Sequence, residues 1–131
     1  MKCISIQQPW AGLILTGYKD VENRSWSTAH RGRLAIHAGA KMYEDSFTSA
    51  SAIMKRIGKR IDPRGMSEFT RSAIVGYVDL IDVVTESASP WFVGEFGWVL
   101  ANPVAIEPIP YKGKLGLFDI PDSLIMAAVA L

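Results

Sequence analysis

The chain has 131 residues, of which 49% are hydrophobic and 21% are charged, and this composition is typical of one soluble globular domain. The 14 Lys and Arg residues nearly balance the 13 Asp and Glu residues, so the net charge of +1 gives no overall field that indicates a nucleic acid or a membrane. The single cysteine, Cys3, excludes an internal disulfide and a cysteine-based zinc site.

Two features of the sequence bear on where the protein acts. Uncharged tracts such as 96–106 are shorter than the ~20 apolar residues that a membrane-spanning helix needs. The first residues lack the long apolar core of a secretory signal peptide. We therefore expect a cytoplasmic protein without a membrane segment.

The start of the chain predicts a strand followed by a short helix. Ile4 and Ile6 alternate with less hydrophobic neighbours, which is the period of a strand. Pro9 suits the first turn of a helix, and Gly17 suits the left-handed residue that ends one. Trp10 lies in this helix, and we expect its side chain to pack into the core.

The next segments predict a second strand and a longer helix. Within 34–38, Leu34 and Ile36 face one side, and His37 faces the other. Apolar residues then recur at helical spacing, which predicts a helix near 42–58.

Positive charge gathers in the first half of the chain. The first 72 residues hold 12 basic and 6 acidic residues, a net charge of +6, whereas the rest hold 2 and 7, a net charge of −5. The stretch 55–64 is the most basic part, and we expect it to form a helix end and a loop within an insertion near 42–70. A basic half is typical of a polyanion binder, although a solvated helix end explains such a stretch without any ligand.

The second half of the chain predicts mainly strands. The run 73–84 is apolar on both faces, and Gly76 marks a bulge or a close backbone contact. A strand over 96–101 should end at Asn102-Pro103. The remaining expected elements are strands at 104–109 and 115–120, a hairpin turn at Lys112-Gly113-Lys114 and an apolar helix at 122–131.

The order of these elements favours an α+β fold. Five to seven short strands without regular strand–helix alternation, flanked by two or three helices, predict a small mixed β-barrel. No repeat or linker divides the chain, so we expect a single domain over 1–131. The apolar helix at 122–131 either closes the barrel or docks on a second copy of the chain.

Six short segments form an ordered series that spans nearly the whole chain. They are 5–11 (SIQQPWA), 17–24 (GYKDVENR), 31–32 with 36–38 (RG and IHA), 74–76 (IVG), 97–100 (GWVL) and 112–117 (KGKLGL). This series resembles the ASCH (activating signal cointegrator homology) domain family of the PUA-like superfamily, and the second segment resembles its G-x-K-x-x-E-x-R signature. The resemblance implies a PUA-like β-barrel, with a cleft beside the first helix into which the signature residues project.

The resemblance also implies a ligand, which is RNA or a modified nucleoside. We expect no cofactor. One branch of the family removes the acetyl group of N4-acetylcytidine, and nuclease activity is ascribed to another. The amidohydrolase branch carries Thr where this chain has Glu22, whereas Lys19 and Arg24 match the signature. The leading interpretation is therefore an RNA- or nucleoside-binding protein. The alternatives are a hydrolase of an N-acylated cytidine-type nucleoside, a metal-independent ribonuclease, or a protein-interaction module that uses the C-terminal helix.

Lys19, Glu22 and Arg24 are the central candidates for a site. In a strand over 20–26, Glu22 and Arg24 lie on one face, roughly 7 Å apart. Arg24 suits a bidentate contact to a phosphate or a base edge. The carboxylate of Glu22 is suited to accept a proton or to hold an exocyclic amine of a base. If the protein is an enzyme, the amine of Lys19 is suited to act as a nucleophile or a base. The alternative is an exposed ion pair worth ~0–1 kcal/mol.

Five further residues are candidates for ligand binding. Gln7 and Gln8 carry amides that both donate and accept, so they either read a base or cap the following helix. Tyr18 and Trp26 flank the charged cluster in the sequence, and their rings are suited to stack on a base. His37 is the better of the two histidines for acid–base chemistry, and a structural role is its alternative. Two histidines without suitably spaced carboxylates predict no metal site.

Overall fold

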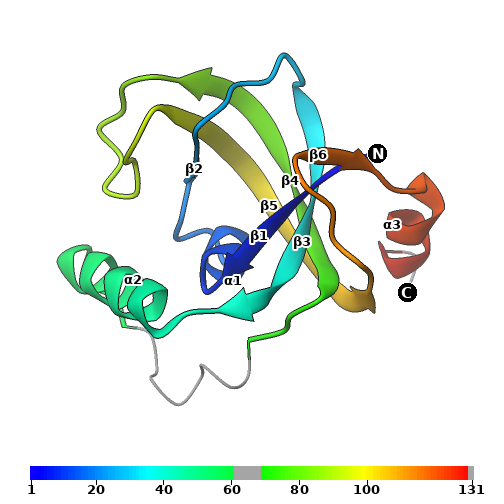
Figure 1. Ribbon diagram of the computed structural model, residues 1–131, viewed down its shortest axis with the longest axis horizontal. Helices are drawn as coiled ribbons and strands as arrows, with labels where there is room; N and C mark the ends of the chain where they lie inside the picture. The colour runs from blue at the N-terminus through cyan, green and yellow to red at the C-terminus, as the bar shows by residue number, and fades with distance from the viewer. Residues whose placement is uncertain (61–68, 130–131) are drawn as a thin grey trace.

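The computed structural model describes residues 1–60 and 69–129, and within them six strands form one mixed sheet with three helices around it (Figure 1). The strands are β1 (Lys2–Gln8), β2 (Val21–Arg24), β3 (Gly32–Met42), β4 (Ala73–Val84), β5 (Phe96–Pro110) and β6 (Leu117–Asp119). The helices are α1 (Trp10–Leu15), α2 (Glu44–Arg56) and α3 (Asp122–Val129). The predicted α+β class and the predicted numbers of strands and helices are confirmed.

The sheet is curled and has an opening beside β1. Its strand order is β2-β5-β4-β3-β1-β6, with β1 and β3 parallel and the other neighbours antiparallel. Figure 1 shows the sheet wrapping around itself in the manner of a barrel. β6 pairs with β1 from Lys2 to Ile4 and stops short of Ser5. Arg24 of β2 reaches this uncovered part of β1, because its Nη2 donates a hydrogen bond to the Ser5 carbonyl over 2.9 Å.

Apolar residues pack on both faces of the sheet. Leu34 and Ile36 belong to the cluster inside the curl, together with the fully buried Trp98. Ala35 belongs to a second cluster, to which α3 contributes Ile125. The predicted division of the β3 side chains between two faces is thus confirmed, and α3 covers the outer cluster.

Strand β5 differs from the prediction, because it continues through the expected stop at Asn102-Pro103. Tyr77 of β4 pairs with Val104, and Asp79 pairs with Ala101, so Asn102 and Pro103 together face a single residue of β4. Asn102 has a φ of 52° there. A bulge of this kind tolerates a proline, which has no N–H to give to a ladder.

The close backbone contact predicted at Gly76 is confirmed. Any Cβ at this position would overlap the carbonyl of Val104 and the side chain of Leu15. Gly76 therefore lets β4 lie against both β5 and α1, and it fixes how α1 sits beside the sheet.

Most predicted boundaries match the observed elements closely. Gly17 has a φ of 87° just after α1, as the sequence predicts for a helix end. The helix expected near 42–58 is α2, and its basic end at Lys55 is exposed. The predicted strand at 115–120 is shorter, because only β6 is a strand and Leu115 is fully exposed. Positions 61–64 of the predicted basic stretch and positions 130–131 of the predicted C-terminal helix lie outside the described residues.

Candidate functional site

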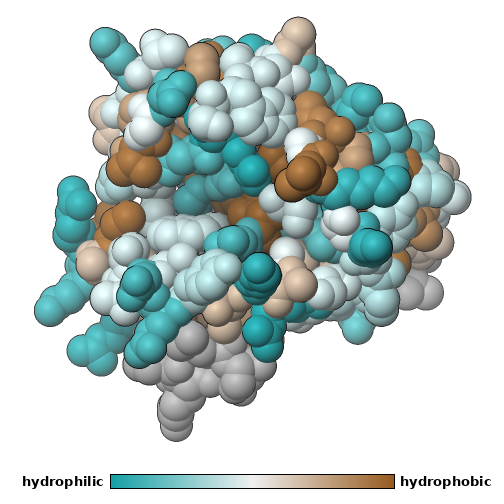
Figure 2. Space-filling view, viewed as in Figure 1, coloured by the Kyte–Doolittle hydropathy of each residue, from teal (hydrophilic) through white to brown (hydrophobic). Residues whose placement is uncertain are grey.

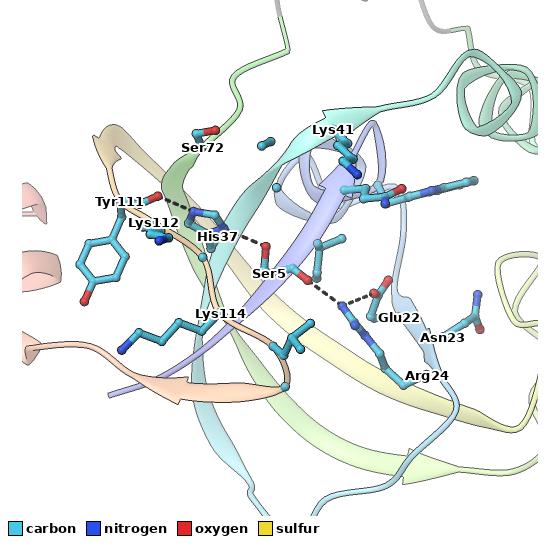
Figure 3. A pocket seen from close by; sticks show the side chains of 18 residues that line it. Ser5, Glu22, Asn23, Arg24, His37, Lys41, Ser72, Tyr111, Lys112 and Lys114 are labelled. Carbon is cyan, nitrogen blue, oxygen red and sulfur yellow. Dashed lines mark hydrogen bonds and ion pairs between the residues drawn. The ribbon is translucent and has the colours of Figure 1, made fainter.

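A cleft of about 1100 Å³ lies over the part of β1 that β6 leaves uncovered (Figure 3). Residues of β1, α1, β2 and the end of β3 line it, together with the connection 111–116 between β5 and β6. Figure 2 shows a hollow in this face of the molecule with hydrophilic residues around it. The charged side chains in the lining are Glu22, Arg24, Lys41, Lys112 and Lys114.

The three charged residues predicted from the signature converge in the structure. Lys19 Nζ lies 2.9 Å from Glu22 Oε1, and Arg24 Nη2 lies 3.0 Å from Glu22 Oε2. Lys19 is only 3% exposed, and its ammonium also donates to the Val21 carbonyl. The alternative of an exposed ion pair is wrong, because Lys19 and Glu22 are both buried.

This cluster holds the guanidinium of Arg24 in place. The carboxylate of Glu22 lies between two cations, so the three groups together carry one positive charge. Arg24 Nη2 also donates to the Ser5 carbonyl, which ties β2 to the floor of the cleft (Figure 3). Glu22 and Arg24 line the cleft, whereas Lys19 lies outside its lining and lies 5.7 Å from the ring centroid of Trp10.

His37 forms a second hydrogen-bonded group in the cleft. Its Nε2 lies 2.7 Å from the Tyr111 carbonyl, which can only accept, so Nε2 carries the proton. Its Nδ1 lies 2.9 Å from Ser5 Oγ and is therefore the acceptor of the Ser5 hydroxyl proton in neutral His37. Gly113 packs over the ring, since a Cβ there would lie 2.7 Å from Cε1.

The two predicted glutamines have different positions. Gln7 is exposed and lines the cleft. Gln8 is buried, and its amide donates to the Thr70 carbonyl over 2.8 Å and accepts from the Gly12 N–H over 2.8 Å. Gln8 thus binds the first turn of α1, as the capping alternative predicts, and Gln7 alone is placed to meet a ligand.

Of the three aromatic residues near the signature, the structure places only Trp10 in the cleft lining. Trp26 packs edge-on against Trp98 at 4.9 Å between ring centroids and lies outside the cleft lining. Tyr18 is 42% exposed and also lies outside it. Trp10, which we expected in the core, is half-buried and lines the cleft, with its ring edge-on to Trp91. It does so because it is the first residue of α1, beside the opening in the sheet.

Several cleft residues are missing from the predicted set. Ser5 and Tyr111 lie there because of strand register and the path of the connection to β6, which no local pattern encodes. Lys112 and Lys114 were expected in a hairpin turn, but β6 pairs with β1 rather than with β5. The connection therefore crosses the cleft, and its two lysines become part of the wall.

Two further findings concern metal-binding clusters and membrane-spanning helices. Residues 1–60 and 69–129 contain no cluster of three or more His, Cys, Asp or Glu side chains placed to hold a metal ion. In the same residues no helix is both long and apolar enough to cross a bilayer.

The fold and the cleft define a class of protein, namely a barrel-like α+β domain with a polar cleft at the opening of its sheet. Residues 4–110 match the family model described as ASCH domain, so the chain belongs to the ASCH domain family. The crystal structure of ASCH from Zymomonas mobilis has the same fold, with a TM-score of 0.61 and 15% identity, covering 99% of this chain and 94% of that one.

Two curated relatives have a higher sequence identity to this chain. Activating signal cointegrator 1 from Homo sapiens is 39% identical over 140 residues, which is 96% of this chain and 23% of that protein. Its counterpart from Mus musculus is 38% identical over 84 residues, covering 64% of this chain and 14% of the relative. The chain thus spans about a quarter or less of the length of the curated relatives it matches.

Proposed function

We propose that the cleft binds single-stranded RNA, with one base, plain or modified, seated against Trp10. The observation that carries this proposal is the composition of the lining, in which four cations meet one carboxylate that is already paired with Lys19 and Arg24. Cations beside an aromatic side chain suit single-stranded nucleic acid, because phosphates meet the cations and a base meets the ring. Membership of the ASCH domain family supports the same ligand.

Each group then has a role that follows from its exposure. Three exposed lysines, Lys41, Lys112 and Lys114, contact phosphates of the RNA backbone where the RNA passes the mouth of the cleft. Arg24 is held by Glu22, and a preorganised guanidinium loses little entropy when it binds an oxygen of the ligand. The exposed amide of Gln7 donates to and accepts from a base edge.

Lys19 is a counter-ion in this proposal rather than a reacting group. Its Nζ is committed to the Glu22 carboxylate and the Val21 carbonyl, and its side chain lies outside the cleft lining. A hydrolase built on Lys19, the alternative that the signature suggests, would need this ammonium to leave both partners. The geometry favours a role in fixing Glu22 and, through it, Arg24.

Fluorescence anisotropy with a labelled single-stranded oligoribonucleotide tests the proposal. Phosphate contacts from the three lysines and from Arg24 predict a slope of log affinity against log salt of about −3, because each contact to a single strand contributes about −0.7. The double variant Lys112→Ala/Lys114→Ala should weaken binding and flatten the slope by about 1.4. A matched variant, Lys2→Ala/Lys59→Ala, removes two cations outside the cleft lining and should bind like wild type. Equal losses in the two variants would contradict the cleft as the site.

A further inference from the structure

We propose that Ser5 is a nucleophile activated by His37, and that the cleft moves an acyl group from an ester first to Ser5 and then to water. Ser5 Oγ and His37 Nδ1 are 2.9 Å apart, which is hydrogen-bonding distance between a nucleophile and its general base. The base is itself oriented, because its Nε2 donates to the Tyr111 carbonyl over 2.7 Å. A nucleophile, a base and a group that orients the base are the three parts that activated serines require.

The backbone fixes this pair without help from a ligand. Ser5 and His37 are direct partners in the parallel ladder of β1 and β3, so their side chains leave the sheet on the same face. His37 is 2% exposed, and its buried ring keeps one tautomer because the Tyr111 carbonyl accepts only from Nε2–H. The proton acceptor, Nδ1, therefore always faces the hydroxyl.

Two glycines leave space around the hydroxyl. A Cβ at Gly113 would lie 3.1 Å from Ser5 Oγ, and a Cβ at Gly39 would lie 3.6 Å from it. Both positions line the cleft together with Ser5, which is half-buried. The hydroxyl is thus held by His37 and remains beside the cavity in which an acyl group would lie (Figure 3).

A positive charge lies at the same residue as the nucleophile. Arg24 Nη2, which is paired with Glu22, donates to the backbone carbonyl of Ser5, and a cation in the cleft wall favours the negative charge that develops on the attacked carbonyl oxygen. Lys112 and Lys114 in the cleft wall suit an ester whose alcohol part carries a phosphate. This choice of substrate class rests on the proposed function, whereas the reactivity of Ser5 does not.

The reaction balances with water as its only co-reactant. Ser5 Oγ forms a bond to the acyl carbon while its proton passes to His37 Nδ1, and the ester C–O bond breaks as that proton passes to the leaving alcohol oxygen. Water then attacks the acyl carbon and gives a proton to Nδ1, which returns it to Ser5 Oγ as the carboxylic acid leaves. A neutral carbonyl stabilises the imidazolium less than a carboxylate does. This slows both half-reactions, whereas an activated ester with a good leaving group speeds acylation alone, so acyl-Ser5 should accumulate with such an ester.

The test uses the whole chain with p-nitrophenyl acetate, a neutral ester that needs no phosphate site. We expect a burst of p-nitrophenol and one acetyl group per chain, which peptide mass spectrometry places on Ser5. Ser5→Ala should abolish the burst, and His37→Gln should slow it about 100-fold or more. Ser49→Ala and His30→Gln change an exposed serine and a histidine outside the cleft and should match wild type. Circular dichroism confirms that each variant is folded, and Ser5→Cys, which keeps a nucleophile, should still become acetylated.

The outcomes separate this proposal from RNA binding. Acetyl groups on lysines alone, or a burst that survives Ser5→Ala, would overturn the nucleophile whether or not RNA binds. A burst that acetylates Ser5, in a chain that does not bind the oligoribonucleotide, would support Ser5 as a nucleophile. It would overturn the proposal that the substrate carries a nucleotide. A preference for phosphate-bearing esters that disappears in Lys112→Ala/Lys114→Ala would support both.

Discussion

The buried carboxylate of Glu22 makes a sharp prediction about stability. Glu22→Ala removes the acceptor of the 2.9 Å bond from Lys19 Nζ and of the 3.0 Å bond from Arg24 Nη2. Lys19 is 3% exposed, so its ammonium is left in the interior without a carboxylate partner among the described residues and keeps its hydrogen bond to the Val21 carbonyl. Breaking a buried ion pair on one side costs about 3–5 kcal/mol. That loss is a large part of the 5–15 kcal/mol that stabilises a typical domain.

Urea denaturation followed by circular dichroism measures this loss as a change in the unfolding free energy. The matched control is Asp119→Ala, which breaks the exposed pair with Lys2 at 3.1 Å and should cost no more than about 1 kcal/mol. The double variant Lys19→Met/Glu22→Leu removes both buried charges and should recover most of the stability lost in Glu22→Ala. A cost for Glu22→Ala as small as that of Asp119→Ala would refute the reasoning.

Three other predictions concern single sites. Gly76→Ala should cost about 1–3 kcal/mol or more in urea denaturation, because its Cβ would overlap the Val104 carbonyl; Gly39→Ala, whose Cβ would have no neighbour closer than 3.6 Å, should cost clearly less. Gly113→Ala should push the His37 ring away and slow any acetylation of Ser5, and an unchanged burst rate would contradict the close packing of Gly113 on that ring. Burial raises the pKa of the Cys3 thiol from 9.0 to about 12, so the folded state keeps a proton that the unfolded state loses above pH 9. The unfolding free energy should then fall by about 1.4 kcal/mol per pH unit from pH 9 toward 12, relative to Cys3→Ala, and parallel curves for the two proteins would show that the thiol does not contribute.

The sequence is informative about elements whose signals are local. The alternation of Ile4 and Ile6, the glycine that ends α1 and the helical spacing of α2 each depend on a few neighbouring residues, and each predicted element is present. The signature also predicts that Lys19, Glu22 and Arg24 lie together, and they do, because all three belong to one turn and one short strand.

Features that depend on distant pairing could not be predicted in the same way. Ser5 meets His37 only because β1 and β3 are parallel and in that register, which no pattern near either residue reveals. Lys112 and Lys114 lie on the cleft because the last strand pairs with the first one rather than with its neighbour in sequence. Apolar spacing placed Trp10 in the core, but the opening beside β1 leaves that side chain in the cleft wall.

The proposed function requires that the cleft over β1 is the surface that meets RNA. A nuclear magnetic resonance titration of the ¹⁵N-labelled chain with a short single-stranded oligoribonucleotide tests this directly. We predict the largest shifts at the Trp10 indole N–H and at the backbone amides of Ser5, Gly113 and Lys114. Shifts confined to the basic end of α2, with the Trp10 indole unmoved, would contradict the account.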